Sequence, residues 1–315
     1  TYCFNHVLVK KYRSELNCGF KDLNYIRHVP VPDLIAEIQY LLRTYSNIRM
    51  FIFDDDLFTY DSAYLQEFCE AYKKTCDIPF VVNAHVRFFD PARARALADA
   101  GCRIVKFGLE SGSPRVRKTI MRRHMSNKEI QQAIAYAKAE GMHTSCFVML
   151  GLPGEESEDV QQTIDLLAEA QPGRFRWTFF YPFPGTEAYR LSEEGGYIDY
   201  HKKETLSNFT ETSCLDFGPD QNLFLSKVGR MMPWFVNARA GFEGSDVYRK
   251  KVGELMAMPG GTGKGESSTL PRAVVAGGIT EGQLQALMTV AKKTGMKQTL
   301  WAVLTPTSET WPLGR

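Results

Sequence analysis

The strongest constraint on the fold is an alternation between residues 47 and 183, where short runs rich in β-forming residues are followed by longer runs of helical periodicity. This alternation is typical of βα units, in which helices cover a parallel sheet. Five strands are predicted, at residues 48–53, 80–86, 103–110, 143–151 and 174–183. Helices are predicted between them, at residues 62–74, 92–101, 126–141 and 157–170. Ser126 and Ser157 are the predicted N-caps of the last two helices.

A further helix is predicted at residues 31–46, ahead of the first of these strands. Parallel neighbours in a sheet are joined by crossovers, so this helix implies one more strand ahead of Thr1. About six strand–helix units predict an α/β fold of the partial or complete (β/α) barrel type, and a partial, TIM-like (β/α)6 barrel is expected here. The chain also begins without methionine, which favours a fragment of a longer protein.

The pattern weakens beyond residue 190, and the rest of the chain is expected to form separate segments. Residues 222–242 and 246–258 look helical, whereas residues 259–272 are rich in glycine and serine. One helix and one strand are predicted near the end, at residues 280–295 and 297–306. The predicted segments are the barrel at 1–191, a helical extension at 192–258, a flexible linker at 259–278 and a small C-terminal segment at 279–315.

Composition restricts the partners and the cellular compartment. The formal net charge of the 315 residues is +2, which provides no strongly basic field to attract nucleic acid or an anionic membrane. No run of about 20 apolar residues occurs, so no membrane span is expected. The seven cysteines are odd in number and scattered, which argues against a disulfide scaffold. A cytoplasmic protein is therefore expected.

Polar and glycine-rich motifs follow the predicted strands, at the edge of the sheet where barrel chemistry takes place. They are Asp54 to Asp56, Asn83 with His85, Glu110 with Ser111, the sequence GLPGE at 151–155 and the sequence PFPGTE at 182–187. Two interpretations of the acidic groups remain open on the residues alone. Asp55, Asp56, His85 and Glu110 could surround a divalent metal in a hydrolytic barrel, or the aspartates could cap helices.

Several motifs in a fixed order point to a known family. The chain begins with "YCFN", and "FIFDDDLF", "FGLESGSPRVRKTIMRR", "GMHTSCFVMLGLPGEE" and "FYPFPGTEAY" follow in that order. Over roughly residues 1–191 this combination resembles the radical S-adenosylmethionine (SAM) domain of the family that often carries an upstream cobalamin-binding domain. "YCFN" is similar to the end of the family's C-x3-C-x-Φ-C motif, with Tyr2 as the aromatic residue and Cys3 as the third cysteine.

The resemblance implies a 4Fe-4S cluster whose open iron chelates the SAM amino and carboxylate groups. Cys3 would be one ligand, and the other two cysteines would lie immediately before Thr1 and four residues earlier. Glu110 and Ser111 would bind SAM, and Arg122 would face the SAM carboxylate, with Arg123 as the alternative. Asp55 and Asp56 would take the place of the family's Gly-Gly-Glu segment, which is absent here. Met149 and Gly151 would lie along the adenine, and Pro182 would have a similar role after the next strand.

The implied activity is reductive cleavage of SAM to a 5'-deoxyadenosyl radical that activates a substrate C–H bond. The implied partners are a small-molecule substrate and a reductant such as flavodoxin or ferredoxin. In the cobalamin-dependent branch the outcome would be methyl transfer or cyclisation, with cobalamin held upstream of this chain. Besides the metal-dependent hydrolase, a barrel that has lost its cluster and serves as a binding scaffold remains an alternative.

Overall fold

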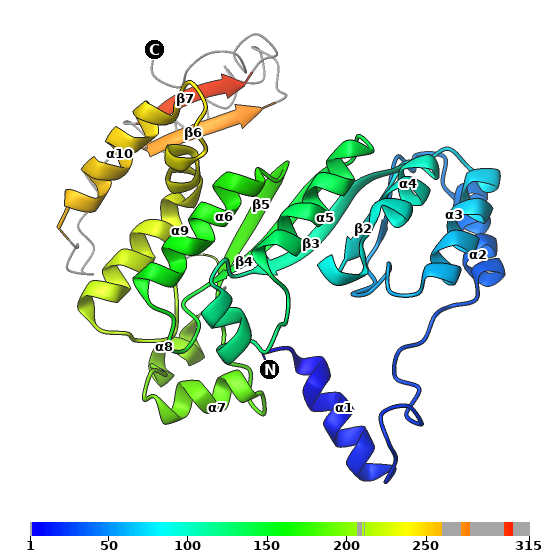
Figure 1. Ribbon diagram of the computed structural model, residues 1–315, viewed down its shortest axis with the longest axis horizontal. Helices are drawn as coiled ribbons and strands as arrows, with labels where there is room; N and C mark the ends of the chain where they lie inside the picture. Colours follow the sequence, from blue (N-terminus) through cyan, green and yellow to red (C-terminus); the bar gives the residue numbers. More distant parts are fainter. Residues whose placement is uncertain (1, 207–209, 211, 260–271, 278–298, 305–315) are drawn as a thin grey trace. The chain divides into compact units, whose positions relative to one another are not determined.

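A computed structural model describes residues 2–206, 210, 212–259, 272–277 and 299–304 of the chain. The chain divides into two compact units, Thr1–Gly241 and Phe242–Arg315 (Figure 1). The predicted α/β architecture is confirmed in the first unit.

The core of the first unit is a five-stranded parallel sheet. Its strands are β1 (Phe51–Phe53), β2 (Phe80–Ala84), β3 (Cys102–Glu110), β4 (His143–Leu150) and β5 (Arg174–Phe179). They lie side by side in chain order, and every neighbouring pair is parallel. Crossovers between parallel strands are right-handed. Because each strand is added on the same side of the previous one, every right-handed crossover places its helix on the same face of the sheet, as in an open, partial barrel.

The connecting helices are α3 (Ser62–Thr75), α4 (Pro91–Asp99), α5 (Asn127–Ala139) and α6 (Ser157–Ala170), and α2 (Val31–Thr44) precedes β1 (Figure 1). Burial along β3 shows which face they cover. Val105, Phe107 and Leu109 are fully buried, whereas Ile104 and Lys106 between them are half-buried. Side chains alternate between the two faces of a strand. The first set therefore packs under the helices, and the second lies on the opposite face, which none of the described helices of the first unit covers.

Helix beginnings confirm one predicted cap and correct the other. Ser126 caps α5 through a capping box with Glu129, whose backbone N–H donates to the Ser126 hydroxyl at 3.2 Å. At α6 the prediction of Ser157 is wrong, because the cap is Glu156. The Asp159 carboxylate accepts a hydrogen bond from the Glu156 backbone N–H at 2.9 Å, which places Ser157 inside the first turn.

Four helices of the first unit lie outside the predicted βα units. Helix α1 (Phe4–Glu15) starts directly after Cys3, and α7 (Glu187–Glu194) and α8 (Tyr200–Thr205) follow β5. Helix α9 (Pro219–Arg239) agrees with the helix expected at 222–242 and packs on the last strand. A Cβ at Gly229 of α9 would lie 2.3 Å from the Phe179 ring, so the missing side chain permits this close approach. These helices belong to the same compact unit as the sheet.

The second unit contains helix α10 (Ser245–Ala257) and two parallel strands, β6 (Arg272–Gly277) and β7 (Thr299–Leu304). Helix α10 and strand β7 were expected from the sequence. Strand β6 falls within the predicted linker at 259–278, so the linker prediction does not hold for these residues. The helix expected at 280–295 lies outside the described residues. Among the helices that the structure describes, none is both long and apolar enough to span a bilayer.

Candidate functional site

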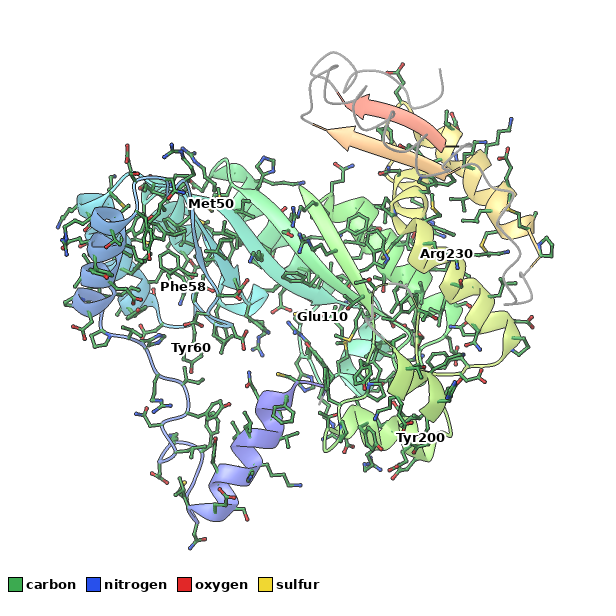
Figure 2. All side chains as sticks on the ribbon, turned by 180° about the vertical axis from the view of Figure 1, so that it is seen from behind. Met50, Phe58, Tyr60, Glu110, Tyr200 and Arg230 are labelled. Atoms are coloured by element: carbon green, nitrogen blue, oxygen red, sulfur yellow. The ribbon has the colours of Figure 1, made fainter. Side chains whose placement is uncertain are left out.

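The candidate site is a cluster of three side chains, Tyr2, Glu110 and Arg123, which come from three separate parts of the first unit. The Arg123 Nη1 donates to the Tyr2 hydroxyl at 2.6 Å and lies 3.5 Å from Glu110 Oε1. The Tyr2 hydroxyl donates to the same carboxylate oxygen at 3.4 Å. The cluster thus ties the residue before Cys3 to the carboxyl end of the central strand β3, where Figure 2 marks Glu110.

Glu110 owes its position to an irregularity at the end of β3. The register with β4 shifts between Gly108 and Glu110, and Glu110 has a φ of +66°. Positive φ is uncommon for residues other than glycine and is found where surrounding contacts hold the backbone in place. Gly108 leaves room for the carboxylate, because a Cβ there would lie 2.7 Å from Glu110 Oε1. The strand end is shaped to present this carboxyl group.

Arg123 reaches Glu110 from the loop between β3 and α5, which includes a short π-helix (Val116–Ile120). The Arg123 backbone N–H donates to the Arg117 carbonyl oxygen at 2.8 Å, and Nη2 donates to the Gly108 carbonyl oxygen at 2.9 Å. The Arg123 Nε is buried and has no hydrogen-bond partner. Buried polar atoms in folded proteins are nearly always paired, so an unpaired N–H donor in a loop at a strand end fits a ligand-binding position.

Burial dominates the electrostatics of the cluster. It raises the pKa of Glu110, and the Arg123 guanidinium opposes that shift. The pKa of Tyr2 is raised by burial and by the Glu110 carboxylate, so the phenol stays protonated. Burial acts against the charge of Arg123, but Tyr2 and Glu110 raise its pKa. The pKa of His85 is lowered to about 4 by burial, with Arg123 and Arg87 adding to the effect. The site therefore holds a permanent cation beside a carboxyl group.

Of the two arginines considered from the sequence, Arg123 occupies the cluster and Arg122 does not. The Arg122 backbone has a φ of +51°, and its side chain is 64% exposed. Its Nη2 donates to the Glu187 carboxylate in α7 at 3.2 Å. Arg122 thus lies outside the cluster of Tyr2, Glu110 and Arg123, and its neighbour Arg123 lies within it. Consecutive residues with such different environments cannot be told apart by spacing alone.

Ser111 is fully buried, and its hydroxyl lies inside the protein rather than in the cluster. Its Oγ is 3.4 Å from the Thr163 hydroxyl of α6 and accepts a hydrogen bond from the Ser113 backbone N–H at 3.2 Å. The buried Arg117 Nη1 donates to the Ser111 carbonyl oxygen at 2.5 Å. Ser111 therefore holds the loop after β3 against α6, and the structure gives its side chain a packing role.

The acidic residues after β1 are divided between two tasks. Asp55 accepts a hydrogen bond from the Leu57 backbone N–H at 2.7 Å, which closes a turn and does not cap a helix, because the N-cap of α3 is Asp61. Asp56 accepts a hydrogen bond from the Asn5 side-chain amide at 3.1 Å. Since Asn5 lies two residues after Cys3, only Asp56 of this pair connects the loop after β1 to the start of α1.

His85 and its neighbours depart from the expected strand geometry. Strand β2 ends at Ala84, and the His85 Nδ1 accepts a hydrogen bond from the Arg87 backbone N–H at 3.2 Å, capping a 3-10 helix. Asn83 donates to the Asp54 carboxylate at 3.2 Å. The strand predicted at 80–86 thus ends two residues early, and His85 lies beyond it.

The GLPGE turn after β4 is held together by hydrogen bonds to its own glutamate, Glu155. The Gly151 and Leu152 backbone N–H groups donate to the Glu155 carboxylate at 2.6 and 3.3 Å. These N–H groups are therefore not available to a ligand in this arrangement. Gly151 has a φ of +72°, as expected for this turn. Sequence reasoning missed the role of Glu155, although a glutamate directly after a glycine–proline turn is the signal that could have revealed it.

Met149 and Pro182 lie at the same end of the sheet as the cluster. Met149 is half-buried, and both it and Tyr2 pack against one hydrophobic cluster that contains Leu152 and Phe180. Pro182 is buried in the turn after β5. In that turn a Cβ at Gly185 would lie 3.5 Å from Val7 of α1. The three strand ends and the beginning of α1 therefore meet in one region.

Cys3 is the residue predicted to bind the iron–sulfur cluster. Cys3 is half-buried and is the N-cap residue of α1. Within the described part of the chain no group of three or more His, Cys, Asp or Glu side chains is placed to hold a metal ion. Cys3 therefore fits as a single thiolate ligand, and a cluster needs further cysteines from outside this sequence. The side chains of Tyr2, Glu110 and Arg123 supply a cation, a carboxyl group and a hydroxyl group, which suit the carboxylate and hydroxyl groups of SAM.

Comparison with known families decides the relationship. Residues 1–167 match the sequence model of the radical SAM superfamily, and residues 272–315 match a domain of unknown function named DUF3783. The chain belongs to the radical SAM superfamily. The resemblance inferred from the motifs is thereby confirmed, and at the level of the family so is the prediction of a radical SAM enzyme.

Curated relatives of this radical SAM chain include methyltransferases. An uncharacterized methyltransferase of Pyrococcus horikoshii is 29% identical over 163 residues, covering 51% of this chain and 35% of the relative. The cytidylyl-2-hydroxyethylphosphonate methyltransferase of Streptomyces wedmorensis is 27% identical over 182 residues, covering 55% and 34%. The chain thus spans about a third of the length of the curated relatives it matches.

Solved structures of radical SAM proteins are similar at low identity. The methyltransferase TsrM from Kitasatospora setae, with cobalamin and a [4Fe-4S] cluster bound, has 18% identity and a TM-score of 0.47, covering 52% of this chain and 34% of that one. Coproporphyrinogen III oxidase from Escherichia coli has 15% identity and a TM-score of 0.47, covering 70% and 52%. These likenesses concern the fold and assign no residue of this chain.

Proposed function

We propose that this chain is the SAM-binding barrel of a radical SAM enzyme that acts on a small-molecule substrate. The observation that carries the proposal is the cluster of Tyr2, Glu110 and Arg123. It joins the residue beside the ligand Cys3 to the end of the central strand, where barrel enzymes hold their substrates.

Each member of the site has a task in this proposal. Arg123, with its buried unpaired Nε, binds the SAM carboxylate, for which a guanidinium group is well shaped. Glu110 accepts a hydrogen bond from a ribose hydroxyl and keeps Arg123 oriented. Asp56 faces the SAM ammonium group from the loop after β1. Met149 and the Gly151 turn provide the apolar surface for the adenine.

Cys3 supplies one thiolate to a 4Fe-4S cluster, and the remaining cysteines come from residues ahead of Thr1. When bound, the reduced cluster would supply the electron that cleaves SAM into methionine and a 5'-deoxyadenosyl radical, and that radical would remove a hydrogen atom from the substrate. The chain itself binds, orients and excludes water, because the difficult chemistry belongs to the cofactors. A flavodoxin or ferredoxin is the reductant, and methyl transfer or cyclisation with cobalamin held upstream is the proposed outcome.

The geometry favours this proposal over the hydrolase with a divalent metal. That alternative needs Asp55, Asp56, His85 and Glu110 to converge on one ion. Instead Asp55 and His85 each accept a hydrogen bond from a nearby backbone N–H. Glu110 is paired with Arg123. The binding scaffold without a cluster has no specific observation in its favour and is an outcome of the experiment below.

The experiment compares Cys3→Ala with Cys18→Ala in the complete gene product. We expect Cys3→Ala to abolish dithionite-dependent formation of 5'-deoxyadenosine and to lower the iron and sulfide content. Cys18 is half-buried and follows α1, so Cys18→Ala should keep both properties and serves as the matched control. Full SAM cleavage by Cys3→Ala contradicts the ligand role. Zinc or manganese without sulfide in the unmodified protein favours the hydrolase, and no metal at all favours the scaffold.

A further inference from the structure

The face of the sheet that none of the described helices of the first unit covers, called the open face below, carries three basic side chains. Lys106 lies in β3, and Arg174 and Arg176 lie in β5. Lys106 is half-buried, and both arginines are exposed. Basic residues are unusual in the middle of a parallel sheet, whose strands normally read as apolar runs because both faces are covered. This open face therefore differs in chemistry from the helix-covered face.

Strand register shows that the three side chains share one face. Lys106 pairs with Ser145 of β4, and Ser145 pairs with Arg174 of β5. In the next row Gly108 pairs with Phe147, and Phe147 pairs with Arg176. Paired residues in a parallel sheet point to the same side. Lys106 is opposite in direction to the buried Val105 and Phe107, so all three basic groups point away from the helices.

The spacing lets the basic groups reach a common ligand. Strands β3 and β5 are separated by β4 alone, which places their backbones about 10 Å apart. Long lysine and arginine side chains can span that interval together. Their rows lie directly before Glu110 along β3, so a ligand held there lies beside the Tyr2, Glu110 and Arg123 cluster.

These basic groups are uncompensated. Among the residues that the structure describes, Lys106, Arg174 and Arg176 have no ion pair and no side-chain hydrogen bond. The next charged residue along β3, Glu110, is already paired with Arg123. Side-chain cations gathered without carboxylates create a positive potential that attracts an anion.

An apolar residue lies beside the cations of the open face. Phe147 of β4 is in the same row as Arg176, between Gly108 and Arg176, and 37% of its surface is exposed. Met149 follows it on the same face and packs against the hydrophobic cluster that Tyr2 also contacts. A ligand that fits this surface has an anionic group for the cations and an apolar part for Phe147 and Met149.

We propose that the open sheet face binds the anionic group of a small substrate, a phosphate, phosphonate or carboxylate, through Lys106 and Arg176. The inference rests on the proposed function, because it places that substrate against the site where SAM binds. Arg174 adds positive charge at the far end of the same face. The substrate's apolar part lies over Phe147 and leads toward Glu110, which brings a C–H bond close to the SAM site.

The test measures anion binding without any turnover. Inorganic pyrophosphate and citrate are titrated by calorimetry into the complete gene product and into Lys106→Gln and Arg176→Gln variants. Losing one charge-assisted contact should weaken binding of the preferred probe about 10-fold in each variant. Preference for pyrophosphate indicates a phosphate or phosphonate substrate, and preference for citrate indicates a carboxylate.

Arg103→Gln is the matched control, because Arg103 is an exposed arginine at the start of β3, at the register shift that precedes the rows of Lys106 and Arg176. Unchanged affinity in Lys106→Gln and Arg176→Gln, or an equal loss in Arg103→Gln, overturns the proposal. If circular dichroism shows that Lys106→Gln does not fold, the two substitutions at the exposed Arg176 are compared. Arg176→Gln should weaken anion binding, whereas Arg176→Lys, which keeps the positive charge, should retain most of it.

Failure of this inference can be told apart from failure of the proposed function. Pyrophosphate binding requires neither the cluster nor SAM cleavage. Intact SAM cleavage with no anion binding rejects the substrate class alone. Anion binding that depends on Lys106 and Arg176, in a protein that does not cleave SAM, rejects the radical SAM activity alone.

Discussion

Two buried glutamates at the ends of neighbouring strands, Glu110 after β3 and Glu155 after β4, serve different purposes. Glu110 contacts the Arg123 guanidinium and the Tyr2 hydroxyl, both from distant parts of the chain. Within the described part of the chain, the Glu155 carboxyl group accepts hydrogen bonds only from two backbone N–H groups of its own turn, and no cation lies within ion-pair distance of it. A carboxyl group held by long-range charged contacts belongs to a binding site, whereas one that closes its own loop supports the fold.

The largest effect is expected from Arg123→Gln, with Arg122→Gln as its control. The variant leaves the SAM carboxylate without its charged partner, and truncating one partner of a buried charge pair across a binding interface costs about 3 kcal/mol, which weakens SAM affinity about 100-fold. Arg122 is exposed and pairs with Glu187, so its substitution should leave SAM affinity nearly unchanged. Equilibrium dialysis with labelled SAM measures both.

A further variant separates binding from stability in this pair. Arg123→Gln leaves Glu110 buried without its cation, so the variant is also less stable. Adding Glu110→Gln removes that penalty and should restore stability without restoring SAM affinity. If the double variant binds SAM as well as the unmodified protein, Arg123 is not the SAM ligand and the contrast between the two glutamates is lost.

Glu155→Gln should change the pH dependence of stability rather than SAM affinity. Burial raises the pKa of Glu155 to about 8 from its ordinary value of 4.5. Between these values the unfolded chain has released the proton while the folded chain keeps it, so stability falls as pH rises through this window. The neutral glutamine removes this pH-dependent contribution, which amounts to about 5 kcal/mol over the whole window.

The measurement for Glu155 is urea unfolding at several pH values across that window. The Glu155→Gln variant should show a flatter dependence of the unfolding free energy on pH than the unmodified protein. An unchanged slope, or a loss of SAM affinity as large as that of Arg123→Gln, would contradict the assignment of Glu155 to its own turn.

The smallest effect is expected from Ser111→Ala. The hydroxyl contacts Thr163 and the Ser113 backbone N–H in a fully buried position, so its loss should lower stability by about 1 kcal/mol. SAM affinity should remain within about 2-fold, well below a 1.4 kcal/mol change. Thermal unfolding together with SAM dialysis checks this. A large loss of SAM affinity without a change in the free energy of unfolding would contradict the packing role and indicate that Ser111 contacts SAM.

The arrangement of the elements could be predicted because it is local. Periodicity and turn residues placed β3, β4, α3 and α5 nearly to the residue, and Ser126 carried a recognisable cap. The prediction failed at α6. There the cap depends on whether the backbone N–H of Glu156 or that of Ser157 donates to the Asp159 carboxylate, and it is Glu156 that does so. Glu156 and Ser157 are consecutive residues, and the hydropathy pattern does not show at which of the two the helix begins.

The candidate site was predictable in outline only. Motif order placed Tyr2, Cys3 and Glu110 at the mouth of the barrel. The choice between Arg122 and Arg123 depended on a backbone turn with positive φ at Arg122, which no spacing rule reveals. Likewise Ser111 follows Glu110 directly in the sequence, yet its hydroxyl packs against α6.

By itself the sequence determined that this protein is a parallel α/β barrel of the radical SAM superfamily, because βα alternation and motif order are properties of neighbouring residues. Only the tertiary structure decided which charged groups meet. Tyr2 and Arg123 are brought to Glu110 by a loop and a chain end that are distant in sequence. Three basic side chains from two strands gather on the open face because all crossovers lie on the other. Such long-range encounters depend on how the chain folds back on itself, and no local pattern encodes them.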